Sequence, residues 1–282
     1  MPSQTQRAYF AIRALNVELA SVKDGNDRRT SSVDKSHSTI AMKMRMAWWR
    51  DALQLLHQKE YNPDASVWRN PVLRALRRAV DEKQLTRRFL ERLVDAREAD
   101  LEIQQMETIE DLISYCEDSC SSLHYLALEC IGVRDEGADE VAGMLGVAWG
   151  LTTAIRSTIF RANNGELSIP ANLLGTTRVH SHYLLARIDE KFQPKPEVEL
   201  ALKESIQYMA HVASQNLRKA HEMQGDVPSS GKSILLHSIP STFYLRKLKD
   251  ADFDLWHPKL ASNEGQLVML AMLARVWWTG KM

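Results

Sequence analysis

The sequence predicts an all-α fold, a single large helical bundle, and three observations support this. Apolar residues recur at intervals of three and four, the period of an α-helix, as in the stretch from Leu112 to Cys130. Alternating runs of β-branched residues, which would indicate strands, are almost absent. Only 12 glycines and 9 prolines occur in 282 residues, and they cluster between the long periodic stretches. Together these features favour one helical domain that spans residues 1–282.

The periodic stretches also give approximate positions for the helices. Helices are expected at about 5–22, 38–58, 68–81, 84–105, 108–132, 136–162, 177–190, 195–224, 231–248 and 263–279. Thr108, followed three residues later by Asp111, predicts a helix N-terminus. Residues 23–37 are polar with mixed charge and are expected to form a mobile loop. Residues 162–176 and 225–231 are expected to be connections, and no stretch is long enough to be a domain linker.

Composition excludes some classes of function. The 36 Lys and Arg residues balance 36 Asp and Glu residues, so a nucleic-acid partner is not expected. The number of cysteines, three, is odd and indicates no disulfide framework, which suits a reducing compartment. No targeting leader is visible at the N-terminus. The longest strongly apolar run, Leu267 to Ala274, is too short to span a bilayer, which leaves peripheral membrane contact open.

Two local patterns suggest functional sites but are better explained by structure. The segment from Gly225 to Ser233 has five residues between its glycines, whereas a phosphate-binding loop has four and follows a strand. A junction between two helices is the better interpretation. Cys116, Cys120 and His124 recur four residues apart, which places the outer two about 12 Å apart on a helix, too far for one zinc ion. They are expected to form a packing stripe of small residues.

The isolated aromatic and histidine residues are also expected to have structural roles. His257 lies between two expected helices, where a role in a turn is favoured over catalysis. The pairs Trp48-Trp49 and Trp277-Trp278 are expected to anchor the core or an interface. Alternatively, the segment from Leu267 to Trp278 docks on a partner or a membrane surface.

One segment, Gly146 to Pro170, resembles the second diagnostic motif of squalene and phytoene synthases. In that family, a helix ending in Leu-Thr-x-Ile-x-Arg leads into Asp-x-x-x-Asp and then Gly-Arg-x-Tyr-x-Pro. The spacing of the family is kept here by Leu151, Thr152, Arg156, Gly165 and Pro170.

The same alignment shows that the two aspartate positions hold Ser157 and Arg161. Aspartates four residues apart share one helix face and offer hard oxygen ligands to magnesium, which bridges to a substrate diphosphate. A serine is a weak ligand, and an arginine places a positive charge where the cation would bind. We therefore expect the magnesium site to be lost, with no cofactor and no catalytic residue.

The first family motif, Asp-Asp-x-x-Asp, is expected on the helix from Ala8 to Asp24. Aligned through its apolar face, this motif reads Val17-Glu18-Leu19-Ala20-Ser21, which retains only the carboxylate of Glu18. The stretch from Met44 to Leu53 resembles the family's QWWRDEL-like helix. The resemblance covers about 5–250 and implies an isoprenoid-synthase-like helical bundle. Relative to the family, the chain is expected to lack an N-terminal helix.

A narrower resemblance connects the chain to a mitochondrial branch of this family, the complex I assembly factor with a phytoene-synthase-like fold. It rests on the segments Ala11–Asp24, Met44–Met46, Ser121–Glu129 and Phe253–Leu260. Relative to that branch, residues 25–36 look like an insertion. The resemblance implies a pseudoenzyme that acts early in the assembly of respiratory complex I, with complex I subunits or assembly intermediates as partners. It also implies a mitochondrial location on the matrix side of the inner membrane.

Two alternative functions stay open at this point. An active prenyltransferase would need two carboxylates that face each other across a cavity, for which Glu18 and Glu166 are the candidates. A metal-free module binding a prenyl or phospholipid ligand would use Arg156 as an anion contact, joined by Arg161 if the helix ends between them. Otherwise Arg156 is expected to pair with a core carboxylate and Arg161 to be solvated.

Overall fold

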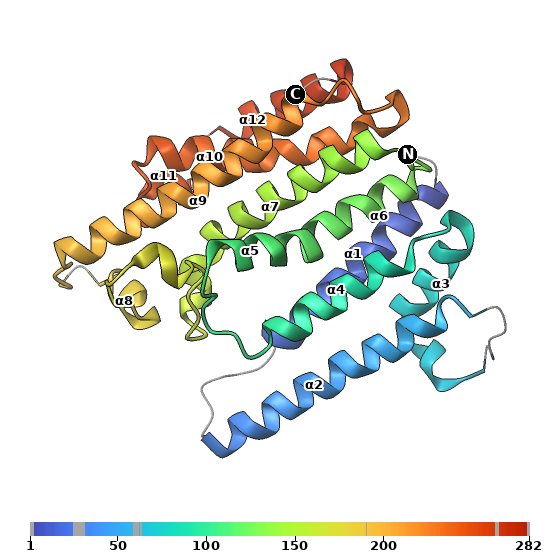
Figure 1. The fold of residues 1–282 in the computed structure, drawn as a ribbon, viewed down its shortest axis with the longest axis horizontal. Helices are drawn as coiled ribbons and strands as arrows, with labels where there is room; N and C mark the ends of the chain where they lie inside the picture. The colour runs from blue at the N-terminus through green and yellow to red at the C-terminus, as the bar shows by residue number, and fades with distance from the viewer. Residues whose placement is uncertain are drawn as a thin grey trace.

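The computed structural model describes residues 3–24, 32–58, 62, 64–189, 191–262 and 265–280, and within them the fold is helical. These residues contain no strand, only an isolated bridge between Gln105 and Leu167. Figure 1 shows a long central helix, α7 (Glu136–Ala162), with the C-terminal helices on one side and the N-terminal helices on the other. The predicted all-α class is therefore confirmed.

The N-terminal layer packs around the buried stripe of the first helix. It comprises α1 (Ser3–Asp24), α2 (Ser32–Leu55), the short 3₁₀ helix η1 (Ser66–Arg69), α3 (Pro71–Lys83) and α4 (Arg87–Asp100). Ile12, Leu15, Leu19 and Val22 follow one another at three and four residues on α1, and each is at most 1% exposed. This stripe, together with side chains from α2, α3, α4 and α6, forms one hydrophobic core.

The central layer consists of α7 and an interrupted helix beside it. This helix comprises α5 (Ile109–Cys116), a π-helical turn η2 (Glu117–Ser121) and α6 (Ser122–Cys130). Helix α7 approaches this turn closely. A Cβ atom added to Gly146 would lie 2.4 Å from the Cα of Ser121, so only glycine permits this approach.

The C-terminal layer covers the other side of α7. It comprises the 3₁₀ helix η3 (Ala171–Leu174), α8 (Ser181–Ala186), α9 (Pro196–Glu222), the 3₁₀ helix η4 (Ser229–His237), α10 (Ser238–Asp250), α11 (Pro258–Ala261) and α12 (Gln266–Thr279). Side chains from α5, α7, α8, α9 and α10 form a second core. A third core joins α6, α7, η4 and α12. None of the described helices is long and apolar enough to cross a bilayer.

Several predicted boundaries need correction. The expected loop 23–37 is shorter, because α1 continues to Asp24 and α2 begins at Ser32. Residues 25–31 lie outside the described residues. The continuous helix predicted over 108–132 is broken by the π-helical turn, and the one over 231–248 starts as a 3₁₀ helix. Apolar periodicity alone does not reveal these breaks, since the same side chains stay buried through them.

Other local predictions are confirmed. Thr108 caps α5 in a capping box with Asp111, whose carboxylate accepts from the Thr108 backbone N–H. The segment from Gly225 to Ser233 follows a helix and enters η4, as a helical junction does. The ring of His257 accepts a hydrogen bond from the backbone N–H of Lys259 and so caps α11. Among the tryptophans expected to anchor the core or an interface, Trp49 is buried in the core, whereas Trp48, Trp277 and Trp278 are exposed, so an interface role for these three stays a prediction.

Candidate functional site

A cavity of about 290 Å³ lies between α1, α4, the α5–η2 segment and the C-terminal end of α7. One part of its wall is apolar, formed by residues such as Leu19, Met46 and Leu112. The other part carries charge. Four cationic side chains line it (Arg13, Lys23, Arg97 and Arg161), against two carboxylates (Asp100 and Glu166). At this size the cavity lies at the small end of the range for ligand pockets.

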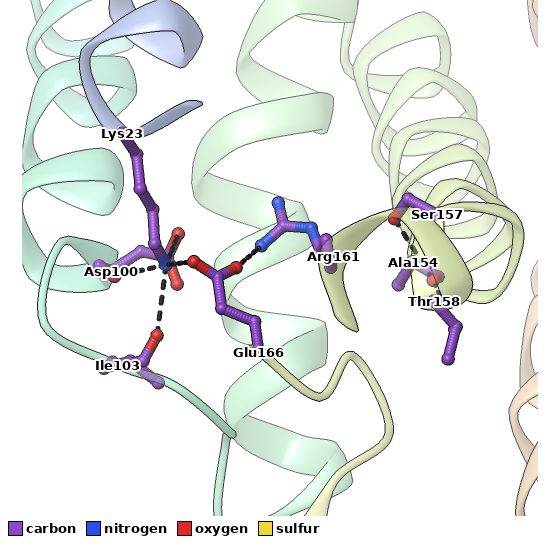
Figure 2. A network of polar contacts seen from close by, with 8 residues as sticks. All are labelled: Lys23, Asp100, Ile103, Ala154, Ser157, Thr158, Arg161 and Glu166. Atoms are coloured by element: carbon purple, nitrogen blue, oxygen red, sulfur yellow. Dashed lines mark hydrogen bonds and ion pairs between the residues drawn. The ribbon is translucent and has the colours of Figure 1, made fainter. Parts of the chain in front are cut away.

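The amino group of Lys23 lies at the centre of a buried polar cluster at one end of this cavity (Figure 2). Its Nζ atom is 2.9 Å from Oδ2 of Asp100 and 3.5 Å from Oε1 of Glu166. It also donates to the backbone oxygens of Asp100, at 2.7 Å, and Ile103, at 3.1 Å. The Lys23, Asp100 and Glu166 side chains are 8%, 9% and 5% exposed, so this ion pairing takes place away from solvent. Charges buried to this degree are costly unless they are paired.

Arg161 supplies a second cation to the same cluster. Its Nη1 atom lies 2.9 Å from Oε2 of Glu166, so the two oxygens of Glu166 face two different positive groups. Burial raises the pKa of Asp100, and the nearby Lys23 and Arg161 oppose that rise. The cluster thus neutralises two buried carboxylates with two internal cations.

The backbone that carries Glu166 is held in place by a turn and by the neighbouring loop. Gly165 has φ of +78°, a left-handed conformation that favours glycine. Beyond it, the N–H of Leu167 donates to the carbonyl of Gln104 at 2.8 Å, and the N–H of Ala171 donates to Met106 at 2.9 Å. This pairing fixes the end of α7 against the end of α4, and so brings Glu166 to Asp100 and Lys23.

Two arginines elsewhere in the cavity wall have no carboxylate partner among the described residues. Arg97 donates to the side-chain oxygen of Asn16 at 2.7 Å, but its buried Nε atom has no hydrogen-bond partner. The guanidinium of Arg13 stacks over Trp149, with 5.9 Å from Cζ to the ring centroid. The cavity therefore retains positive charge after its two carboxylates are paired.

Comparison with known proteins identifies the fold family. Residues 1–266 match the squalene/phytoene synthase family. The chain belongs to that family. Among curated proteins, the complex I assembly factor 6 of Rattus norvegicus is 31% identical over 276 residues, which cover 98% of this chain and 75% of the rat protein. The Drosophila melanogaster homologue is 31% identical over 282 residues, covering 99% of this chain and 76% of that protein.

Solved structures support the same fold. A dehydrosqualene synthase in complex with ligand superposes with a TM-score of 0.69 at 15% identity, covering 99% of this chain and 89% of that chain. A squalene synthase from Alicyclobacillus acidocaldarius gives a TM-score of 0.57 at 14% identity, covering 90% and 97%. The expected isoprenoid-synthase-like bundle is thereby confirmed.

The two positions of the second squalene/phytoene synthase motif both line the cavity. The hydroxyl of Ser157 donates to the carbonyl of Ala154 in its own helix at 3.3 Å (Figure 2), whereas Arg161 pairs with Glu166. Of the retained positions, Gly165 forms the left-handed turn, and Pro170 precedes η3 with extended backbone angles.

The three positions assigned to the first motif lie beside the cavity face of α1. Val17 is 64% exposed, Glu18 and Ser21 are half-buried, and none of them lines the cavity. The hydroxyl of Ser21 donates to the carbonyl of Glu18 at 2.8 Å. The cavity is instead lined by Asn16 and Ala20, one residue before the assigned register. Either register leaves α1 without an aspartate on this face.

The carboxylates that do reach the cavity do not fit a magnesium site. Magnesium needs several oxygen ligands in octahedral geometry, usually from one or two free carboxylates plus phosphate and water. Here Asp100 and Glu166 already face the ammonium of Lys23, and Glu166 also faces Arg161. Within the described residues, no group of three His, Cys, Asp or Glu side chains gathers as metal ligands.

The structure separates Arg156 from Arg161, so the condition under which both could reach one anion is not met. Helix α7 continues to Ala162, so it does not end between them. Arg161 lines the main cavity, whereas Arg156 lines a different groove beside α10 and α12. The expected partners are also reversed, because Arg161 pairs with a buried carboxylate and Arg156 is exposed.

The stripe of Cys116, Cys120 and His124 packs as predicted. A Cβ atom on Gly150 would lie 2.3 Å from Sγ of Cys116, which shows how tightly α7 packs there. Burial raises the pKa of both thiols, which disfavours the reactive thiolate form. The ring of His124 lies 4.5 Å from that of His237, centroid to centroid.

Sequence reasoning predicted Arg161 but missed the other three cations that line the cavity, Arg13, Lys23 and Arg97. Lys23 lies three residues after Ala20 on the same face of α1, so helical spacing gives a signal for it. No comparable signal exists for Arg97 or Asp100, because their partners are far away in the sequence. Lys23 and Asp100 are 77 positions apart in the sequence, and they come into contact only in the folded chain.

Proposed function

We propose that this squalene/phytoene synthase family member is a non-catalytic protein that acts early in the assembly of mitochondrial respiratory complex I. Complex I subunits or assembly intermediates are its proposed partners. Its proposed location is the matrix side of the inner mitochondrial membrane.

The charge of the cavity wall is the main support for a non-catalytic function. Prenyl transfer with magnesium needs anionic side chains that hold cations against a diphosphate. In this chain, the positively charged side chains of Lys23 and Arg161 already form ion pairs with the two buried carboxylates. A divalent ion would have to displace a paired ammonium from an environment that is almost free of solvent.

The assembly role is supported by the near full-length relatives. Proteins named complex I assembly factor 6, from Rattus norvegicus and Homo sapiens, are 31% and 30% identical over 98% of this chain. The similarity therefore includes the N-terminal helices, the cavity and the C-terminal layer together.

A metal-free binding module is the second candidate, and one observation favours it. Among the described residues, Arg13 and Arg97 line the cavity without a carboxylate partner, and Nε of Arg97 is buried without an acceptor. An anionic group of a prenyl or phospholipid ligand would satisfy that donor. The earlier basis for this alternative, convergence of Arg156 and Arg161, is not supported. An active prenyltransferase using Glu18 and Glu166 is disfavoured, because Glu18 does not line the cavity.

The assembly role is tested by deleting the gene in cells that make this chain. Native gel electrophoresis of respiratory complexes is expected to reveal loss of mature complex I, with the other complexes retained. Reintroducing the chain is expected to restore complex I, and so is the variant Ser157→Ala. Within the part of the chain that the structure describes, the Ser157 hydroxyl donates to the carbonyl of Ala154 in its own helix, and we propose that it holds no metal. A normal amount of complex I after deletion would overturn the assembly role. A Ser157→Ala variant that folds but fails to restore complex I would overturn the proposal that the protein is non-catalytic.

A further inference from the structure

The outward face of α12 is apolar although it is exposed. The helix packs on the molecule through Met269, Met272, Leu273 and Val276, which recur at three and four residues. The opposite half of the helix carries Leu267, Leu270 and the two tryptophans Trp277 and Trp278, which are 81%, 56%, 73% and 82% exposed. A helix that is apolar on both its packed and its exposed faces indicates a further contact for the exposed one.

A groove of about 340 Å³ adjoins this helix. It is lined by side chains of α7, α10, α11 and α12, including Gln266 and Met269 of α12 itself. Two of its lining residues, Arg156 and Lys247, are cationic, and none is acidic. Arg156 is exposed and makes no ion pair with a carboxylate among the described residues. The Lys247 amino group lies 5.6 Å from the ring centroid of Phe243 and donates to the carbonyl of Ser262 at 2.7 Å. The rest of the wall is largely apolar, with residues such as Ile159 and Leu260.

Positive charge also flanks the apolar face of α12. Arg275 is exposed on the helix, and the Lys232 side chain lies against Gly280 at its C-terminal end, where an added Cβ would be 2.7 Å from Cδ of Lys232. The described part of α12 contains no Asp or Glu. Exposed leucine and tryptophan flanked by basic residues are the features of a helix that lies in the interface of an anionic membrane.

We propose that the surface formed by α12 and the adjoining groove docks on an anionic phospholipid bilayer, with Arg156 and Lys247 contacting a headgroup phosphate. The apolar side chains of α12 enter the boundary between headgroups and acyl chains, where tryptophan is favoured. The 14 residues of α12 are too few to span a bilayer, so the helix lies along the surface. This inference does not depend on the role in complex I assembly, and it uses a face separate from the family cavity.

Vesicle co-sedimentation of the full chain tests the proposal. Binding is expected to vesicles of equal phosphatidylcholine and phosphatidylglycerol, and to be much weaker to phosphatidylcholine alone. The variant Trp277→Ser/Trp278→Ser is expected to lose most of this binding. Arg156→Gln/Lys247→Gln is expected to weaken binding to the anionic vesicles by roughly tenfold or more, because two cations next to the lipid surface are removed.

A matched control removes the same charge from another surface. Arg74→Gln/Arg78→Gln changes two exposed arginines of α3, which Figure 1 places away from α12, and should bind nearly as the wild type does. Thermal unfolding by circular dichroism verifies that each variant is folded. The proposal is overturned if folded wild type does not sediment, or if the α12 variants bind as well as the control. It is also overturned if the tryptophan variant converts a dimer into a monomer, because the face would then join two copies of the chain.

Discussion

Lys23 is the residue that most clearly sets this cavity apart from a metal site. Its ammonium contacts the carboxylates of Asp100 and Glu166 and two backbone oxygens. This set of oxygen atoms around one positive charge resembles the surroundings of a bound cation. Arg161 adds a second charge on Glu166, at the position where the motif alignment places an aspartate. The substitution found in the sequence therefore has a defined partner in the fold.

Replacing Lys23 by methionine tests whether its ammonium stands in place of a cation. Lys23→Met leaves Asp100 and Glu166 buried with one fewer positive group. We expect a loss of about 3–5 kcal/mol in the free energy of unfolding, measured by urea titration. Millimolar magnesium or calcium is expected to raise the melting temperature of this variant and to leave that of the wild type unchanged.

Lys43→Met is the matched control, because Lys43 pairs with Glu102 at 2.7 Å while both side chains are at least half exposed. The free energy of unfolding of Lys43→Met is expected to fall by no more than about 1 kcal/mol. A Lys23→Met variant as stable as Lys43→Met would contradict a central role for the buried ammonium.

At the scale of secondary-structure elements, sequence periodicity predicts α7 well and the segment beside it less well. Helix α7 spans the predicted residues, since Asp135 caps its start by accepting from the N–H of Ala138. The π-helical turn η2 was not predicted. It lies against α7 at Gly146, and this close approach is a tertiary contact that local sequence does not reveal. The same reasoning applies to the site. Ser157 and Arg161 follow from the motif, whereas the pairing of Lys23 with Asp100 depends on how α1 and α4 meet.

The contact between α7 and η2 can be tested with two glycines of the same helix. In Gly146→Ala, the new Cβ would lie 2.4 Å from Cα and 2.6 Å from the backbone N of Ser121, so the two segments must separate. We expect a loss of about 1–3 kcal/mol in the free energy of unfolding, despite the better helix propensity of alanine.

Gly143→Ala is the control, because its Cβ would meet only the Tyr125 side chain, 2.6 Å from the hydroxyl oxygen, and that chain can rotate away. Urea unfolding of the two variants is compared directly. Equal stability would mean that η2 is not held by the approach at Gly146.

At the scale of the whole molecule, the two histidines between the α6, α7 and η4 segments link stability to pH. Burial lowers the pKa of His237 to about 4, with Arg13 adding to the effect, and burial also lowers the pKa of His124. The buried Nδ1 atom of each ring has no hydrogen-bond partner among the residues that the structure describes. Both rings are therefore favoured as neutral groups in the folded chain.

The expected consequence is a loss of stability in mild acid. Because His237 has a lower pKa folded than unfolded, its contribution is complete above about pH 6.5 and is lost as pH falls toward 4. The full contribution is about 3 kcal/mol. His237→Gln should flatten the stability profile in this window, whereas His211→Gln, at an exposed position, should not. Asp100, whose raised pKa acts in the opposite direction, is present in all three proteins and leaves the comparison intact.

We propose that this member of the squalene/phytoene synthase family has lost prenyl transfer, because its own cations occupy the cavity carboxylates. The most direct measurement is diphosphate release from farnesyl or geranylgeranyl diphosphate by the purified chain with magnesium, beside an active synthase of the family. We expect no release above buffer. Magnesium-dependent release that persists in Ser157→Ala and disappears in Glu166→Gln would contradict it, because Glu166 would then serve a metal rather than Lys23 and Arg161.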